Sequence, residues 1–311
     1  MATDHPPHPA SPGPSSPRPA DPPGSLDPLT ARKTCRTVEP LHGMIYFAPE
    51  AGRSYARLGL RAEAGYFASR SAAMGAVGAD TVIATFFNFY PGLVRDVIPE
   101  AWAIAAPSAV LASRLDAADA ALRRMLGAAV DSPEMVRAAD LARRAAERAA
   151  QRYEGRPLFA AHAGLPWPGP AHLELWHAQT LLREYRGDGH IAALVMHDLD
   201  PVGALGLHLA TGDLPEAFLR GTRGWPEASW EAGVDRLVAR DLVTRVEPTD
   251  SHPATVALTE RGVSLREDIE TETDRAAVYA YEALSDEECS ELRTLARPFS
   301  RAVVEAAGFG F

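Results

Sequence analysis

The spacing of apolar residues predicts helices through the first half of the chain. Between 107 and 126, leucine and alanine recur at three- and four-residue intervals, which is typical of a helix with one apolar face. A serine followed by a proline favours the start of a second helix, rich in alanine and arginine, over 132–153. Shorter helical patterns occupy 41–106 and are separated by prolines and glycines. We therefore expect the first half to be helical.

Further helical patterns and a hairpin follow in the second half. Three apolar patterns of helical spacing cover 173–199, 201–209 and 226–243. Two short runs rich in β-branched residues, 244–247 and 255–258, are separated by a turn with two prolines and predict a β-hairpin. A closing helix is expected after them. This order of helices, hairpin and helix is that of a winged helix.

Two segments of the second half resemble known winged-helix proteins. The stretch 228–243 is similar to the recognition helix of MarR-type proteins. The segment Leu258-Thr259-Glu260-Arg261-Gly262 is similar to the end of their wing, where leucine and threonine precede a glycine. The resemblance implies a MarR-like fold and no particular function.

Four further segments carry a wider resemblance: 65–75, which contains the run Gly-Tyr-Phe-Ala-Ser-Arg, and 85–89, 175–178 and 182–190. They are similar to an actinobacterial family of helical-plus-winged-helix proteins. Members of that family are often encoded near natural-product genes. The resemblance implies a small-molecule ligand and assigns no reaction.

These patterns together predict a mainly α fold, with an N-terminal helical domain and a C-terminal MarR-like winged helix that has a small β-hairpin wing. Residues 1–30 are expected to be a disordered head, because ten of the 26 prolines lie there and large apolar residues are scarce. The other predicted units are an N-terminal helical domain (31–130), a connector helix with an irregular proline-rich linker (131–170), and a winged-helix domain with C-terminal helices (171–311).

The composition excludes several classes of protein. A formal charge of −10, from 31 basic and 41 acidic residues, excludes a surface coated with basic charge for nucleic acid. Lys33 is the only lysine in the chain, which effectively excludes catalysis through a lysine Schiff base. Cys35 and Cys289 cannot form a disulfide framework or a cysteine zinc cluster, and they fit a reducing cytoplasm. Without a secretory signal or a run of about 18 apolar residues, a cytoplasmic protein with no membrane segment is expected.

Acidic residues occupy the helix that would read DNA. A winged-helix DNA binder needs polar or basic side chains on that helix and cations on its wing. Here Glu227, Glu231 and Asp235 lie on the helix, and the turn 247–254 has no arginine or lysine. DNA binding through this module is therefore disfavoured. Two alternatives stay open: the acidic helix is an ordinary solvated face, or DNA binds elsewhere, for example along the arginine-bearing helix 137–152.

The densest group of chemically active side chains lies between residues 177 and 190. His177 and Glu184 are seven residues apart and therefore share one face of a helix. A histidine near a carboxylate can act as a general acid–base pair, and an arginine can hold an enolate or a carboxylate. The candidate catalytic residues are His177, Glu184, Asp188 and His190.

Gly187 and Gly189 interrupt the apolar pattern of this segment. Asp188 would then cap a new helix over 189–196, or backbone N–H groups would be free to meet a ligand. The alternative is structural: the arginines and carboxylates form an ion network between the two halves, with the histidines as core residues. The spacing of the histidines matches no strong zinc pattern, so no metal is expected.

Aromatic residues are expected to wall an apolar pocket between the two halves, although aromatics at helical spacing also suit a plain core. Asn88 lies among four aromatic residues, and a buried amide needs partners, so it is a candidate for orienting a ligand. The candidate ligand-binding residues are Tyr66, Phe67, Arg70, Phe87, Asn88, Trp176, Thr180, Arg183 and Arg186.

No glycine-rich phosphate loop, nucleophile elbow or paired-cysteine motif occurs, so no cofactor is expected. We predict a small-molecule-binding protein that has lost DNA binding and acts as a cofactor-free tailoring enzyme in bacterial natural-product biosynthesis, by dehydration, cyclisation or isomerisation. The alternative is a MarR-like, ligand-responsive transcriptional regulator. The expected partners are a largely apolar metabolite and a second copy of the chain, which would pack through helix 266–284 and the C-terminal segment.

Overall fold

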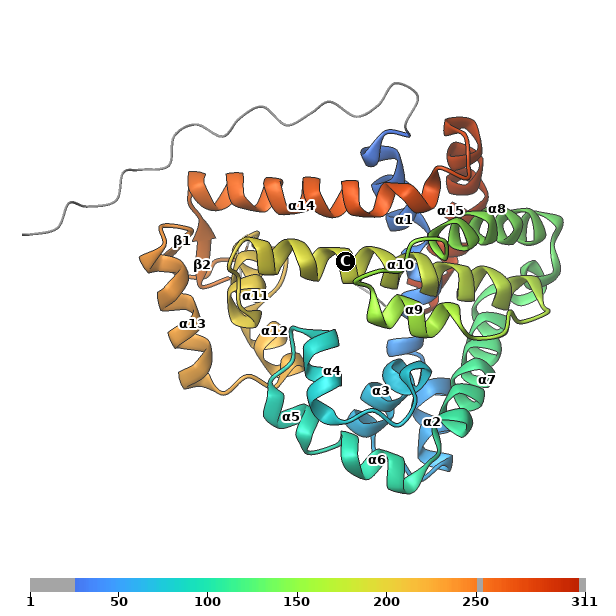
Figure 1. Ribbon diagram of the computed structural model, residues 1–311, viewed down its shortest axis with the longest axis horizontal. Coiled ribbons are helices and arrows are strands. Elements are labelled where there is room, and N and C mark those ends of the chain that lie inside the picture. Colours follow the sequence, from blue (N-terminus) through green and yellow to red (C-terminus); the bar gives the residue numbers. More distant parts are fainter. Residues whose placement is uncertain (1–25, 251–253, 308–311) are drawn as a thin grey trace, which may run out of the picture.

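Helices make up most of the regular structure (Figure 1). The computed structural model describes residues 26–250 and 254–307. The helices up to residue 163 are α1 (Pro28–Gly43), α2 (Pro49–Arg57), α3 (Ala62–Ser71), α4 (Ala79–Phe86), α5 (Pro91–Arg95), α6 (Ile98–Ile104), α7 (Pro107–Leu126), α8 (Pro133–Ala149) and α9 (Pro157–Ala163). The remaining elements are α10 (Ala171–Met196), α11 (Pro201–Leu209), α12 (Glu216–Arg223), α13 (Glu227–Ala239), β1 (Val243–Arg245), β2 (Val256–Leu258), α14 (Glu260–Tyr281) and α15 (Asp286–Ala307). The prediction of a mainly helical chain is confirmed.

The two strands form the predicted hairpin. They pair antiparallel, with Val243 opposite Leu258 and Arg245 opposite Val256. Residues 251–253 of the predicted wing turn lie outside the described residues, as do residues 1–25 of the predicted head. The structure thus confirms a small two-stranded antiparallel sheet.

Local capping explains where several helices begin. The Ser132 hydroxyl accepts the Met135 N–H at 3.1 Å and starts α8, as the serine–proline pattern predicts. The Asp200 carboxylate accepts the Gly203 N–H at 2.7 Å and starts α11 in the same way. These starts are encoded within a few residues, and for that reason the sequence could predict them.

Helix α10 runs without a break through Gly187 and Gly189, so the predicted interruption is wrong. A Cβ atom built at Gly189 would lie 2.9 Å from Arg156 Nη1 and 3.1 Å from Ala276 Cβ. Glycine at this position lets the Arg156 side chain and α14 approach the α10 backbone closely. The glycine serves helix packing and does not mark a helix end.

Helix α9 lies within the segment that was predicted to be an irregular linker, so that part of the prediction is also wrong. Pro157 occupies its first position, where a missing N–H costs nothing. The Asp188 carboxylate then accepts the Phe159 N–H at 3.0 Å. Asp188 thus caps α9 from the middle of α10, and the helix it was expected to cap does not exist as a separate element.

Two hydrophobic clusters hold the fold together, and α10 contributes to both. The larger cluster combines α1 to α9 with the first part of α10, the end of α14 and α15. The smaller cluster combines Ala193 and Leu194 of α10 with α11, α12, α13, the hairpin and Ile269 of α14. The larger cluster includes α15, which the predicted boundaries place in the C-terminal unit. Those boundaries stay a prediction.

The two C-terminal helices pack within the chain. Helix α14 lies along α10 (Figure 1), and α15 packs on α1, α7 and α8. These are the helices expected to form a dimer interface, and the faces they use here are taken by their own chain. The dimer stays a prediction. Within residues 26–250 and 254–307, none of the helices has the length and apolar character needed to span a membrane.

Candidate functional site

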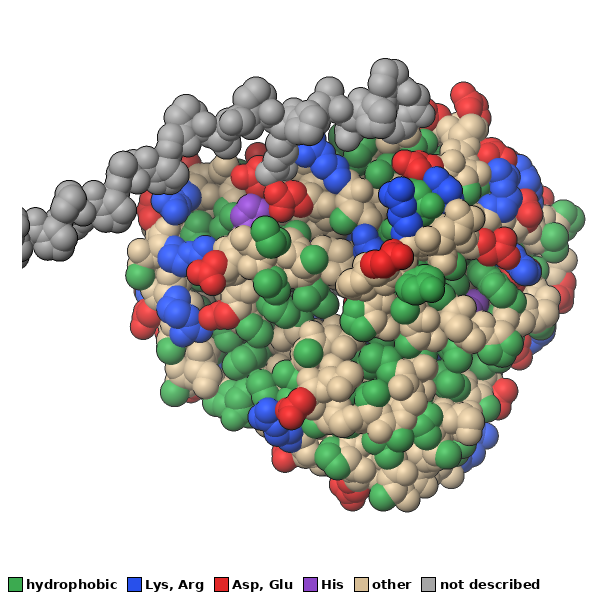
Figure 2. All heavy atoms as spheres, in the orientation of Figure 1, with side chains coloured by type: hydrophobic (Ala, Val, Ile, Leu, Met, Phe, Trp, Pro, Cys, Tyr) green, Lys and Arg blue, Asp and Glu red, His purple; other side chains and the backbone are tan. Residues whose placement is uncertain are grey.

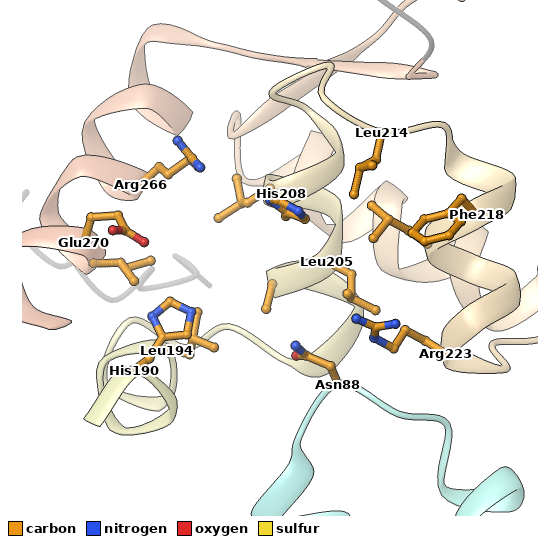
Figure 3. A pocket seen from close by; sticks show the side chains of 14 residues that line it. Asn88, His190, Leu194, Leu205, His208, Leu214, Phe218, Arg223, Arg266 and Glu270 are labelled. Carbon is orange, nitrogen blue, oxygen red and sulfur yellow. The ribbon is translucent and has the colours of Figure 1, made fainter. Parts of the chain in front are cut away.

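A pocket of about 320 Å³ lies where α10, α11, α12 and α14 meet the segment that follows α4 (Figure 3). We call it the α12 pocket. Figure 2 shows apolar side chains gathered over the region of α11 and α12. The apolar residues that line the pocket include Leu194, Leu205, Leu214, Phe218, Leu219 and Ile269. The polar residues that line it are Asn88, His190, His208, Arg223, Arg266 and Glu270.

The backbone after α4 turns sharply and brings Asn88 beside α12. Phe87 has a φ of 57° and a ψ of −60°, and such a positive φ is rare for a residue with a side chain. Trp225 Nε1 donates to the Asn88 carbonyl at 2.9 Å, and the Tyr90 N–H donates to the Arg223 carbonyl at 2.9 Å. These bonds join the two segments, and Figure 3 shows the Asn88 and Arg223 side chains next to each other.

Both side chains carry a buried atom that lacks a partner. Asn88 Oδ1 and Arg223 Nε have no hydrogen bond to any described residue. Arg223 Nη1 donates to the neighbouring Thr222 hydroxyl at 2.9 Å, and the guanidinium lies 5.0 Å from the centre of the Phe89 ring. Burial lowers the pKa of Arg223. An unsatisfied buried polar atom costs about 1–3 kcal/mol, so a hydrogen-bonding group placed at this wall would offset part of that cost.

The opposite wall is formed by α14 and α10. Glu270 lines the pocket, but its carboxylate is paired with Arg186 at 3.1 Å and with two arginines of α1. His190 Nδ1 lies 2.9 Å from the Thr273 hydroxyl, which itself donates to a backbone carbonyl, so Nδ1 is the donor. Burial lowers the pKa of His190, so its ring is neutral at pH 7 and Nε2 is an acceptor.

Of the predicted site residues, the structure brings only Asn88 and His190 to this pocket. Arg186 does not line the pocket. It pairs with Glu270, which does, and with Asp274 at 2.7 Å. Most of the others surround a separate group of charges beside the larger cluster, in which Arg70 and Glu184 are buried and Glu39 and Arg183 are about one third exposed. We call it the inner ion cluster, and it consists of Glu39, Arg70, Arg183 and Glu184.

The inner ion cluster holds Glu184 between two arginines. Arg183 Nη1 lies 3.3 Å from Glu184 Oε1, and Arg70 Nη2 lies 3.6 Å from it. Arg183 Nε also bonds Glu39 at 2.7 Å. Burial would raise the pKa of the Glu184 carboxyl, but the charges of Arg183 and Arg70 outweigh burial and lower it. Glu184 is therefore ionised and held in place by its two arginine partners.

The aromatic candidates pack around this cluster. Arg70 Nη1 donates to the Tyr66 hydroxyl at 3.0 Å, and its guanidinium lies 4.2 Å from the centre of the Phe86 ring. Phe67 is buried against these rings. The Thr180 hydroxyl donates to the Trp176 carbonyl at 2.9 Å, so it accepts from His42 Nδ1, which lies 2.8 Å away. Among the predicted ligand-binding residues, Phe87 packs on the smaller cluster.

His177 lies away from the carboxylate it was expected to work with. No hydrogen bond joins His177 to Glu184 among the described residues, and its ring packs edge-on against Trp167 at 4.9 Å. Burial and the nearby Arg114 charge lower the pKa of His177 to about 4. Burial raises the pKa of Asp188 to about 6, and its bond to α9 opposes the rise. The catalytic assignment stays a prediction, and these surroundings give Glu184 and Asp188 structural uses.

The buried histidines predict a stability that falls in acid. The folded-state pKa of His177 is below that of the unfolded chain, so the unfolded chain binds more protons as the pH falls below 6.5. The contribution of the neutral His177 ring to the free energy of unfolding is fully present above pH 6.5 and is lost as the pH falls toward 4. Between pH 7 and pH 4.5, we expect the free energy of unfolding of His177→Asn to fall by about 2 kcal/mol less than that of the wild type. Urea unfolding at both values measures this, and equal losses in the two proteins would contradict it.

Sequence reasoning missed His208, Arg223, Arg266 and Glu270. Each lies at an ordinary helical position, and the pocket forms only because five segments converge. The signal nearest to this site is the set of aromatics around Asn88, which singles out a residue that lines the pocket. No spacing rule connects it with α12.

Comparison with known families adds one result. A protein-family model described as a helix-turn-helix family matches residues 31–310. No curated protein and no solved structure matches the chain. The match covers almost all of the described structure, including the α12 pocket and the inner ion cluster. The chain therefore belongs to this helix-turn-helix family.

Proposed function

We propose that this helix-turn-helix protein binds a small, largely apolar metabolite in the α12 pocket. One observation carries the proposal: an apolar wall surrounds two buried polar atoms, Asn88 Oδ1 and Arg223 Nε, that lack partners. Ligand sites are commonly apolar cavities of about 300–1,000 Å³ with a few polar groups. The pocket meets this description at its lower limit.

The surface of α13 supports the further proposal that DNA binding has been lost. Arg236 pairs with Asp200 at 2.6 Å, and Arg245 pairs with Glu231 at 2.8 Å and with Asp235 at 2.7 Å. A cation that already has a carboxylate partner gains less from a phosphate. Asp200, at the start of α11, thus neutralises Arg236, and the acidic residues of α13 neutralise Arg245, two cations that a MarR-like reader would present to DNA.

A MarR-like, ligand-responsive regulator is the second candidate, and membership of the helix-turn-helix family favours it. Helix α11 lines the pocket and packs on α13, so a ligand could alter the position of α13. The measurement that would favour this candidate is a mobility shift with promoter DNA that weakens with salt and is lost when Arg236 and Arg240 are replaced.

A cofactor-free tailoring enzyme would draw its acid–base groups from the α12 pocket under this proposal. His190 and His208 line the pocket, and burial lowers the pKa of each ring. His177 and Glu184 do not line it. Turnover that survives His177→Ala and Glu184→Gln would agree with this placement, and turnover lost in both folded variants would favour the original assignment.

Filling the pocket is expected to abolish binding of an apolar probe. Ala204 lines the pocket, so Ala204→Trp should occupy its space and reduce saturable binding of N-phenyl-1-naphthylamine at least tenfold. The probe is neutral and fluoresces in apolar surroundings. The control is Ala103→Trp, which adds the same side chain at an exposed position of α6 that does not line the pocket. Undiminished binding to Ala204→Trp, or no saturable binding to the wild type, would contradict the proposal.

A further inference from the structure

The lining of the α12 pocket has more unpaired positive charge than unpaired negative charge. No carboxylate of the described residues lies within 4.0 Å of the Arg223 or Arg266 guanidinium. Glu270 is the one acidic side chain in the lining, and it is paired with Arg186, Arg32 and Arg36. Its negative charge is therefore already compensated outside the pocket. The pocket keeps an excess of positive charge.

Arg223 presents a particular edge. Its Nη1 atom is bonded to Thr222, whereas Nε is buried and unpartnered. Nε and Nη2 lie on the other edge of the planar guanidinium, and two parallel N–H groups on one edge match the two oxygens of a carboxylate. The Asn88 amide beside this edge offers a further hydrogen-bonding group for a substituent next to the carboxylate (Figure 3).

The rest of the pocket is apolar. Leu194, Leu205 and Ile269 line its interior, and Phe218, with 48% of its surface exposed, lies at its outer side. Such a wall suits a hydrocarbon chain or ring. Burying it there removes apolar surface from water, at about 25 cal/mol for each Å². Charge and apolar surface are thus separated within one cavity.

We propose that the metabolite of the α12 pocket is an amphipathic carboxylic acid, whose carboxylate is bound by Arg223 and whose apolar part lies against α10, α11 and α12. This inference rests on the proposed function and adds the chemical class of the ligand. A carboxylate would satisfy Arg223 Nε and offset the excess positive charge, which a neutral or cationic head group would not.

Calorimetric titration with three compounds of equal chain length tests the proposal. We expect octanoate to bind the wild type at least tenfold more tightly than octanamide, and octylamine to bind least. Arg223→Gln should weaken octanoate about 10- to 100-fold and leave octanamide nearly unchanged. The control is Arg220→Gln on the same helix, because Arg220 does not line the pocket.

Two failures can be told apart. If N-phenyl-1-naphthylamine binds and is blocked by Ala204→Trp, but octanoate and octanamide bind equally, the carboxylate is wrong and the pocket stands. An equal loss of octanoate affinity in Arg223→Gln and Arg220→Gln would also overturn the role of Arg223. If the neutral probe does not bind, the proposed function fails and the inference fails with it.

Discussion

Replacing Glu184 with glutamine is expected to lower the free energy of unfolding by about 3–5 kcal/mol, the usual cost of leaving a buried charge without its partner. The Glu184 side chain is 5% exposed and is shared by Arg70, which is 10% exposed, and Arg183. Glutamine keeps the shape but removes the negative charge between them. Urea unfolding followed by circular dichroism measures the change.

A surface pair supplies the control for this experiment. Glu147 pairs with Arg143 on α8 at 2.7 Å, and about half of its side chain is exposed. Glu147→Gln should cost less than about 1 kcal/mol, because water screens an exposed ion pair. A Glu184→Gln protein as stable as the wild type would contradict the structural use of Glu184, and lost turnover in that protein would support the catalytic prediction.

Replacing Gly262 with alanine is expected to destabilise the protein by about 3 kcal/mol, at the upper end of the usual cost of overpacking. A Cβ atom at this position would lie 1.9 Å from the Leu242 carbonyl oxygen, which belongs to the backbone and cannot rotate away. The N–H of Gly262 also bonds the Thr259 hydroxyl at 3.0 Å at the start of α14. Thermal and urea unfolding would both report the loss.

Gly221 gives the matched substitution. It lies on α12, and a Cβ atom there would meet no atom within 4 Å. Gly221→Ala should therefore be neutral or stabilise the protein by up to about 1 kcal/mol, because alanine favours the helix. Similar effects of the two substitutions would show that the close contact at Gly262 is unimportant.

The close approach of Gly262 to the Leu242 backbone also explains a sequence motif. The pattern of leucine, threonine and glycine at 258–262 was recognised by resemblance alone. In the structure, Thr259 caps α14 and Gly262 lets that helix start against the Leu242 backbone. The pattern is therefore explained by the way the hairpin joins α14. It reflects the fold and does not indicate a ligand or DNA site.

Whether the start of a helix was predictable depends on how far along the chain its capping residue lies. The starts of α8 and α11 depend on caps three residues away, and they were predictable. The start of α9 depends on Asp188, 29 residues from the N–H it accepts, and it was not. Gly189 carried a local signal for a break, but contact with α14 decided its role.

The amino-acid sequence by itself determined the helical class, the hairpin, the order of elements and the acidic character of α13, because periodicity, caps and turns act within a few residues. Only the tertiary structure decided which charges are paired and where a pocket forms. Arg183 and Arg186 lie three residues apart on α10, yet they bond Glu39 and Asp274 on different helices. Ion pairs and cavities depend on distances between segments that are far apart in the chain, and no local pattern encodes those distances.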